Sequence, residues 1–388
     1  MVYLDAAAST RVDDEVIDVM LPFFSRSYAN ASSIHSLGRK ADDAITHSRE
    51  LIAETINAKA REVIFTSGGT ESNNLALKGA AFARGEGHII TSKIEHDCVL
   101  NASKWLEQQG FRVTYLDVDS EGFVHPDDIE DAIADDTILV SIMHANNEIG
   151  TIEPVTEIGK VCQKHEVLFH TDACQSYTKV PIDVEEMNLD LMTINSHKIH
   201  GPKGVGALYI KSGTDIDPLL HGGGHEYGIR SGTENVPGIV GFAKAVEVAK
   251  GSDADRMRKL RDKLIEGLLE IPNTRLNGPR RNRLCNNVNV SFEFIEGEAI
   301  TLGLDSEGIE VSTGSACSSD TLEASHVLLA IGLPEEVAHG SVRLSLDKYT
   351  MEEDIEYTIE TTQQVVSNLR RFSPFKRRQD LETFEGGE

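Results

Sequence analysis

Residues 195–204 read Asn195-Ser196-His197-Lys198-Ile199-His200-Gly201-Pro202-Lys203-Gly204 and directly follow the apolar run 191–194, Leu-Met-Thr-Ile. The glycine and proline residues end this run in a turn, so Lys198 is expected at the end of a buried strand. An amine at such a place is partly desolvated, which lowers its pKa and suits it to forming a Schiff base. A solvated loop lysine beside a turn is the alternative, and this stretch taken alone favours it.

A second polar cluster upstream favours the functional interpretation of Lys198. The apolar run 167–169 is followed by His170-Thr171-Asp172-Ala173-Cys174-Gln175. Asp172 and Gln175 are therefore expected at the carboxyl edge of a neighbouring strand, so that both clusters face one crevice. An aspartate that keeps a pyridinium nitrogen protonated, together with an imine-forming lysine, is the arrangement that pyridoxal phosphate (PLP) requires.

Short β-branched runs alternate with helical patterns through the first part of the chain. Strands are expected at 63–65, 89–90, 113–116, 138–143, 167–169 and 191–192, with helices at 71–84, 99–109, 126–134 and 155–165. This alternation predicts an α/β fold, with a mainly parallel sheet covered by helices on both faces. Ligands bind such sheets at the carboxyl ends of the strands.

A glycine-rich segment, Thr66-Ser67-Gly68-Gly69-Thr70, follows the first expected strand and opens a helix. Glycine lets the backbone approach a ligand closely, and the free N–H groups and dipole of a helix start suit a phosphate. A structural turn would explain the glycines equally well. It would not explain their pairing with Lys198.

Composition excludes several classes of protein. The chain has 388 residues and a net charge of -26, which argues against general binding to nucleic acid or anionic membranes. Five scattered cysteines without a C-x-x-C pair indicate neither a disulfide framework nor structural zinc, and fit reduced thiols in the cytoplasm. The start of the chain lacks the pattern of a secretory leader, so an unexported protein is expected. His165-Glu166 precedes His170 by one residue too many for H-E-x-x-H, so no metal site is expected.

Cys317 stands apart from the other cysteines. It lies in the small-residue run 312–320, Ser-Thr-Gly-Ser-Ala-Cys-Ser-Ser-Asp, which has no apolar periodicity and is expected to be a mobile, exposed loop. Accessibility and thiolate fraction decide the reactivity of a thiol, so Cys317 is the expected reactive cysteine. Cys174 lies between Asp172 and Gln175, and is expected to pack behind its strand.

Several motifs occur in an order that resembles one family. They are Thr66–Asn74 (TSGGTESNN), Glu95-His96, Asn146–Gly150 (NNEIG), His197-Lys198, Arg230–Asn235 (RSGTEN) and Gly314–Cys317 (GSAC). Each motif alone is weak, but the ordered set is specific. The chain resembles the IscS/NifS-type cysteine desulfurases, which are PLP enzymes of fold type I in the class-V aminotransferase family, from Tyr3 to about Pro374.

The resemblance implies a role for each matching residue. Lys198 would hold PLP as an imine, His96 would stack on the pyridine ring and move protons, and Cys317 would attack the substrate sulfur. Arg343 would bind the substrate carboxylate through its planar fork. Asn147 would contact cofactor or substrate, and Gln175 would donate to the phenolic oxygen of PLP. The remaining implied cofactor contacts are Gly69, Thr70, Asp172, Asn195, His197 and Thr233.

The implied reaction converts L-cysteine to L-alanine and leaves a persulfide on the enzyme. Its sulfur would supply iron–sulfur cluster assembly, through an IscU-like scaffold, or tRNA thiolation. A homodimer is implied, with Thr233 reaching the cofactor phosphate of the other subunit. Alternatives are another PLP enzyme of the same fold, such as an aminotransferase or a selenocysteine lyase, or a platform that docks a scaffold with Cys317 as cluster ligand. The Gly-Ser-Ala-Cys segment argues against an aminotransferase.

Three residues depart from the family pattern. Asn195 stands where a serine that helps to bind phosphate is usual, Ser196 replaces a glycine or alanine, and Asp347 replaces a common glycine. These departures bear on phosphate affinity and on the shape of the substrate pocket.

The length predicts two domains. A charged run at 253–261 begins a long helix, which we take as the boundary. Residues 14–252 are then the PLP-binding domain, and 253–375 a smaller α+β domain that carries the cysteine loop. The resemblance adds residues 1–13 to the smaller domain, and residues 376–388 form a polar tail.

Overall fold

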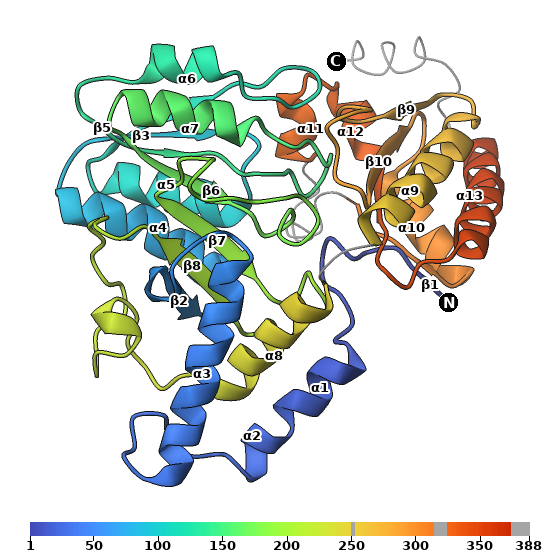
Figure 1. Cartoon of the computed structure of the whole chain (residues 1–388). Coiled ribbons are helices and arrows are strands. Elements are labelled where there is room, and N and C mark those ends of the chain that lie inside the picture. Colours follow the sequence, from blue (N-terminus) through green and yellow to red (C-terminus); the bar gives the residue numbers. More distant parts are fainter. Residues whose placement is uncertain (250–252, 314–323, 374–388) are drawn as a thin grey trace.

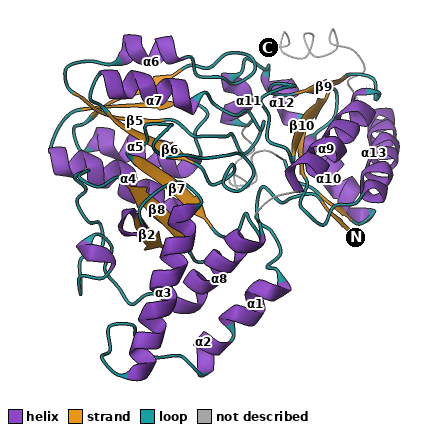
Figure 2. Cartoon of the chain, in the orientation of Figure 1, coloured by secondary structure: helices purple, strands orange, loops and turns teal. Residues whose placement is uncertain are grey.

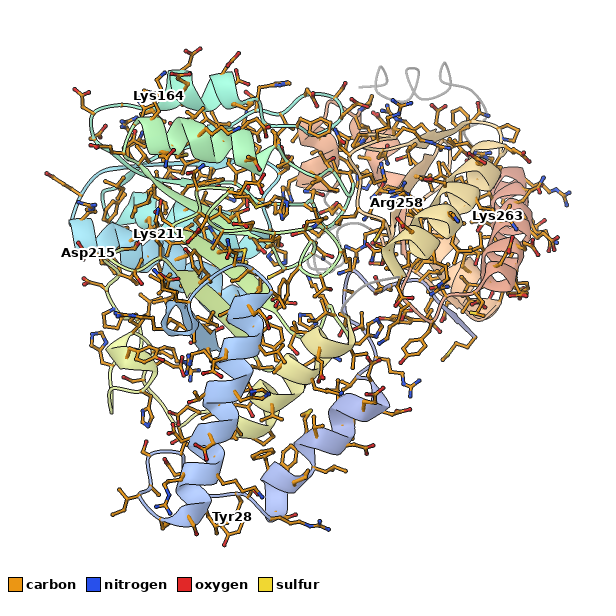
Figure 3. The ribbon with its side chains drawn as sticks, viewed as in Figure 1. Tyr28, Lys164, Lys211, Asp215, Arg258 and Lys263 are labelled. Carbon is orange, nitrogen blue, oxygen red and sulfur yellow. The ribbon has the colours of Figure 1, made fainter. Side chains whose placement is uncertain are left out.

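The structure is a computed structural model that describes residues 1–249, 253–313 and 324–373. Two bodies of secondary structure lie side by side, a larger one on the left of Figure 1 and a smaller one on the right. Their outer helices carry charged side chains. Lys164 pairs with Glu130 on the outside of the larger body, and Lys263 with Glu352 and Glu356 on the outside of the smaller (Figure 3).

A seven-stranded sheet forms the centre of the larger body, in the order β2-β8-β7-β6-β5-β3-β4. The pairs β7·β6, β6·β5, β5·β3 and β3·β4 are parallel, which confirms the predicted mainly parallel sheet. The strands are β2 (Val63–Thr66), β3 (His88–Ser92), β4 (Arg112–Leu116), β5 (Thr137–Ser141), β6 (Leu168–Asp172), β7 (Leu191–Asn195) and β8 (Gly206–Ile210).

Strand β8 was not predicted. It follows the Lys198 turn directly and runs antiparallel to both β7 and β2, in the register Leu191 with Ile210 and Val63 with Tyr209. It inserts between two strands that are far apart in sequence, and this tertiary pairing has no local signal. The predicted first strand, β2, therefore lies at the sheet edge.

Alternate side chains of the strands pack into two separate cores, because successive residues of a strand point to opposite faces of the sheet. Ile89 and Leu139 face the core of α4 (Gly69–Arg84) and α5 (Asp97–Gln108). Ile90 and Val140 face the other core. That second core is closed by α1 (Asp14–Met20), α3 (Ser36–Glu54), α6 (Pro126–Ala132), α7 (Val155–Lys164) and α8 (Val236–Val248). Helices on both faces are as predicted (Figure 2).

The smaller body has its own core, into which Val2 and Leu4 insert beside Leu264, Val290 and Val366. Its elements are β1 (Val2–Tyr3), α9 (Asp253–Leu269), β9 (Thr274–Leu276), β10 (Asn287–Phe292), α10 (Gly297–Ser306), β11 (Ile309–Glu310), β12 (Ser341–Ser345) and α13 (Glu352–Phe372). Two small sheets, β12-β10-β9 and β1-β11, complete it. We infer from the separate cores that the chain divides into domains near residue 253.

Two short helices lie between the bodies, α11 (His326–Ala330) and α12 (Glu335–His339). Val327 and Leu328 of α11 pack against Ile94 and Met143 of the larger body. Segments from the C-terminal part of the chain thereby reach the carboxyl edge of the large sheet. The helix α2 (Pro22–Ser25) extends α1 at the far corner of the larger body.

Candidate active site

A cavity of about 470 Å³ opens at the carboxyl ends of β6 and β7, beside the start of α4. It brings together nine of the residues that the sequence singled out: Gly69, Thr70, His96, Asn147, Asp172, Asn195, His197, Lys198 and Arg343. Asp172 ends β6 and Asn195 ends β7, and the two strands are parallel neighbours. The expected shared crevice therefore exists.

Asp172 is a buried carboxylate that stays ionised. Its Oδ1 accepts the Cys174 backbone N–H at 2.9 Å, and its Oδ2 accepts the Asn73 side-chain amide at 2.6 Å. Burial alone would raise the pKa of Asp172, but the hydrogen bonds from Cys174 and Asn73 outweigh burial and lower it. A buried anion of this kind suits a protonated ring nitrogen as its partner.

His96 is the N-cap of α5, and its Nδ1 accepts the Cys98 backbone N–H at 3.1 Å. The Cys98 thiol lies at 3.1 Å from the same nitrogen. Burial lowers the pKa of His96, and the charge of Lys198 lowers it further. The ring is therefore neutral near pH 7 and can exchange a proton inside the pocket.

The start of α4 offers space for an anion. The N-cap Gly68 has φ 151°, a conformation that favours glycine. A Cβ on Gly69 would lie 2.8 Å from Cys174 Sγ, so a side chain there would collide with the pocket wall. Asn195 lies beside this helix start, and its buried Oδ1 has no hydrogen-bond partner within the described residues.

Lys198 lies on the turn after β7 and is held through its backbone. Its carbonyl accepts the Lys179 Nζ at 3.2 Å, and the same ammonium donates to the Gln175 carbonyl at 3.1 Å. Burial lowers the pKa of Lys179 to about 8. The preceding residue, His197, contacts Ser9, with His197 Nδ1 at 3.3 Å from Ser9 Oγ.

Arg343 reaches the cavity from β12 of the smaller body. Its guanidinium donates to Asp5 Oδ1 at 3.0 Å and to the Asn147 carbonyl at 3.2 Å. Its Nε is buried and has no partner within the described residues. Asp5 faces both Arg343 and Lys198, yet burial raises its pKa above the ordinary value. These bonds use two of the five guanidinium N–H groups, so the outer nitrogens keep donors for another anion.

Four residues that the sequence singled out are not found in the cavity. Gln175 does not line the cavity, and its amide donates to the Ala7 carbonyl at 2.9 Å. Thr233 is exposed and outside the cavity. Cys317 lies outside the described residues. Asp347 closes a turn by accepting the N–H groups of Tyr349 and Thr350, and it lines a different, smaller cavity.

Cys174 corrects one expectation. It was expected to pack behind its strand, but it lines the cavity with its sulfur against the start of α4. In the tight turn after β6, the Asp172 carboxylate accepts the Cys174 N–H. The Cys174 side chain then lies toward Gly69 at the start of α4.

Sequence reasoning missed three residues of the cavity region, Asn73, Cys98 and Asp5. Asn73 follows the glycine-rich segment by one helical turn, and that spacing from Gly69 was a usable signal. Cys98 is two residues beyond His96, at the second position of a helix whose cap the sequence did not mark. Nothing local connects Asp5 with Arg343, because 338 residues separate them.

The described cysteines are free thiols: Cys98, Cys162, Cys174 and Cys285. Burial raises the pKa of Cys98 and of Cys162 to about 12. Within the described ranges no group of three or more His, Cys, Asp or Glu could hold a metal ion. Those ranges also contain no helix long and apolar enough to cross a membrane.

Comparison with known proteins identifies the family. Residues 2–358 match the aminotransferase class-V family. The cysteine desulfurase IscS of Dictyoglomus turgidum is 54% identical over 383 residues, which cover 97% of each chain. The chain therefore belongs to the class-V aminotransferase family, and within it to the cysteine desulfurases of the IscS/NifS type.

Solved structures agree with this assignment. A NifS-like protein superposes with a TM-score of 0.89 at 42% identity, over 95% of this chain and 100% of its own. A structure of SspA in complex with cysteine has a TM-score of 0.82 at 41% identity, over 90% of this chain and 100% of its own. The fold is the PLP-dependent transferase fold of type I.

Proposed function

We propose that this cysteine desulfurase holds pyridoxal 5'-phosphate on Lys198 and takes sulfur from L-cysteine. The observation that carries the proposal is that Lys198, the ionised Asp172 and the first residues of α4 line one cavity. The SspA structure with cysteine supports the choice of substrate. When bound, PLP supplies an electron sink for negative charge that develops on the substrate.

The residues present fit this cofactor. The free N–H groups at the helix start, Gly69 and Thr70, line the cavity and suit the phosphate. Asp172 suits the ring nitrogen. Asn195, which departs from the family pattern, has its amide Nδ2 directed toward Gly69, so it can donate where a serine hydroxyl otherwise would. His197 completes the lysine side of the cavity.

The chain's own groups then position the substrate and move protons. Arg343 binds the substrate carboxylate through the N–H groups that its bonds to Asp5 and Asn147 leave over, while the Asn147 carbonyl orients the guanidinium. The neutral His96 and the Lys198 amine exchange protons with the substrate. Gln175 donates to the Ala7 carbonyl, and its second amide hydrogen would serve the phenolic oxygen of the cofactor.

Sulfur leaves on Cys317. Its thiolate attacks the substrate Sγ, the substrate Cβ–Sγ bond breaks, and a new S–S bond forms on the enzyme. The bonding electrons stay with Cβ, which takes a proton and leaves in alanine. The persulfide then passes to an acceptor, either an IscU-like iron–sulfur scaffold or the machinery of tRNA thiolation. The free described thiols support a reducing, cytoplasmic location.

The working unit is a homodimer. Three apolar side chains are exposed from α2 to the start of α3, namely Phe24 at 63%, Tyr28 at 69% and Ile34 at 91%. Tyr28 lies at the outer end of this segment (Figure 3). Exposed apolar side chains on one stretch of chain fit contact with a second copy. Thr233 is exposed on its loop, so it is free to reach the phosphate of a neighbouring subunit.

The test is a visible absorption spectrum with and without L-cysteine, combined with mapping of the sulfur. The cofactor band should change on addition of L-cysteine, and mass spectrometry should find one extra sulfur on Cys317. Cys317→Ala should keep the spectral change and lose sulfide release, because the buried thiols are poor nucleophiles. Undiminished sulfide release by Cys317→Ala, or the extra sulfur on another cysteine, would refute the mechanism.

A further inference from the structure

The cavity contains a thiol that the mechanism does not use. Cys98 Sγ lies 3.1 Å from His96 Nδ1 and 3.0 Å from Asn73 Nδ2. The Asn73 amide also donates to Asp172 Oδ2 at 2.6 Å. Cys98 therefore stands between the residue that faces the ring nitrogen of the cofactor and the histidine that moves protons.

The direction of each hydrogen bond follows from its donor. An amide NH₂ can only donate, so Cys98 Sγ is the acceptor from Asn73. The orientation of Asn73 is settled by the carboxylate of Asp172, which would repel the amide oxygen. The S–H of Cys98 is then free to point at His96 Nδ1. Burial raises the pKa of Cys98 to about 12, so the thiol keeps its proton.

The hydrogen bonds also fix which ring nitrogen of His96 carries the proton. The Cys98 backbone N–H donates to His96 Nδ1 at 3.1 Å, and a backbone N–H cannot accept. Nδ1 therefore carries no proton, and a neutral ring must carry its proton on Nε2. The Cys98 thiol is a second donor to Nδ1 and strengthens this preference. A proton on Nδ1 would point at both donors and break both hydrogen bonds.

We propose that Cys98 is a positioning residue that keeps the His96 proton on Nε2, through a one-way hydrogen-bond chain from Asn73 to the thiol to Nδ1. The inference rests on the proposed role of His96. It deepens that role by stating which ring atom exchanges the proton and which side chain reinforces the tautomer that the Cys98 backbone N–H selects.

Other charges face the same ring and must be held constant in any test. They come from four elements: Asp97 from α5, Asp172 from β6, Lys198 from the turn after β7, and His326 from α11. These four groups act on the ring through their charge, whereas the Cys98 side chain contacts Nδ1 directly. Because replacing Cys98 changes no formal charge, a change in the pKa of His96 would report the loss of the thiol hydrogen bond.

The test is nitrogen NMR of ¹⁵N-histidine-labelled, cofactor-loaded protein, with His96→Gln to assign the signals. Wild-type His96 should show a protonated Nε2 and a bare Nδ1. In Cys98→Ala the ring should titrate about 0.5 to 1 pH unit higher, the size expected for one lost hydrogen bond to the neutral form. Cys98→Ser keeps an O–H donor and should recover most of the difference.

Cys162→Ala is the matched control, since Cys162 is a buried thiol on α7 outside the cavity, and it should titrate like the wild type. Where turnover is measured, the acid limb of kcat/KM should move with the NMR titration. A proton on Nδ1 in the wild type, or an unchanged titration in Cys98→Ala, overturns the inference. The NMR result does not depend on turnover, so an inactive wild type would refute the proposed function and leave this inference standing.

Discussion

Asp172 shows how a single residue fixes the chemistry of the cavity. It is buried and still ionised, because Cys174 and Asn73 donate to its two oxygens. Asp172→Ala should leave the cofactor bound through its phosphate and lower sulfide release by orders of magnitude, because the ring loses its anionic partner. Sulfide assays and cofactor absorbance measure this.

A matched control exists at the other end of the same strands. Asp190 pairs with Lys211 and accepts the Phe169 N–H, away from the cavity. Asp190→Asn should keep the cofactor spectrum and the turnover of the folded protein. Full activity of Asp172→Ala with an unchanged spectrum would remove Asp172 from the mechanism.

At the residue scale, the sequence identified the strand-end residues but not their supports. Lys198 and Asp172 were predictable, because each follows an apolar run and such runs end at one sheet edge. Asp5 was not, because its partner lies 338 residues away. Asn73 was missed although its spacing from Gly69 was a usable signal. Cys98 was not singled out, since nothing local links its sulfur to Asn73.

At the element scale, the turn after β6 holds a strained residue. Thr178 has φ 66°, a left-handed conformation that is costly for a β-branched side chain. The turn presents Lys179 to the carbonyls of Gln175 and Lys198. The strain therefore lies beside the contact that joins the two strand ends.

Thr178→Gly should relieve this strain and stabilise the protein by about 1 kcal/mol, which raises the thermal midpoint by about 2 °C. Thr178→Ala keeps the left-handed requirement without the branched side chain, so its midpoint should fall between the two. The thermal midpoints of the wild type, Thr178→Gly and Thr178→Ala measure this strain. A midpoint for Thr178→Gly below that of the wild type would show that the turn is unstrained.

The elements also show where prediction from the sequence stopped. The alternation of β-branched runs and helices located β2 to β7, because both periodicities are local. Strand β8 was missed, since its place between β7 and β2 depends on pairing with a strand more than 140 residues earlier. Cys317 lies outside the described residues, so its role as the reactive cysteine stays a prediction from the sequence.

At the scale of the whole molecule, buried histidines couple folding to pH. His170 is fully buried between Ser141 and Thr193, and burial lowers its pKa from 6.5 to about 4. A lowered pKa means that the unfolded chain binds a proton which the folded chain does not. Stability from this residue is therefore complete above about pH 6.5 and is lost as the pH falls toward about 4.

His170→Asn should remove that proton uptake. Between about pH 6.5 and 4, the free energy of unfolding of the wild type should fall more steeply than that of the variant, by about 1.4 kcal/mol per pH unit. Denaturant unfolding across this range measures both slopes, whatever the stability of the variant at pH 7. His47→Asn, exposed on α3, is the control. Parallel slopes for wild type and His170→Asn would mean that His170 titrates equally in both states.

The two bodies of the molecule meet at the cavity, which takes Lys198 from the larger and Arg343 from the smaller. The central claim is that Lys198 holds the cofactor, and borohydride reduction of the loaded protein followed by peptide mapping tests it most directly. The account predicts the cofactor on the peptide with Lys198, and none after Lys198→Ala. The neighbouring amine of Lys179, whose pKa burial lowers to about 8, is the natural competitor. Cofactor reduced onto Lys179, or onto any other lysine, would contradict the account.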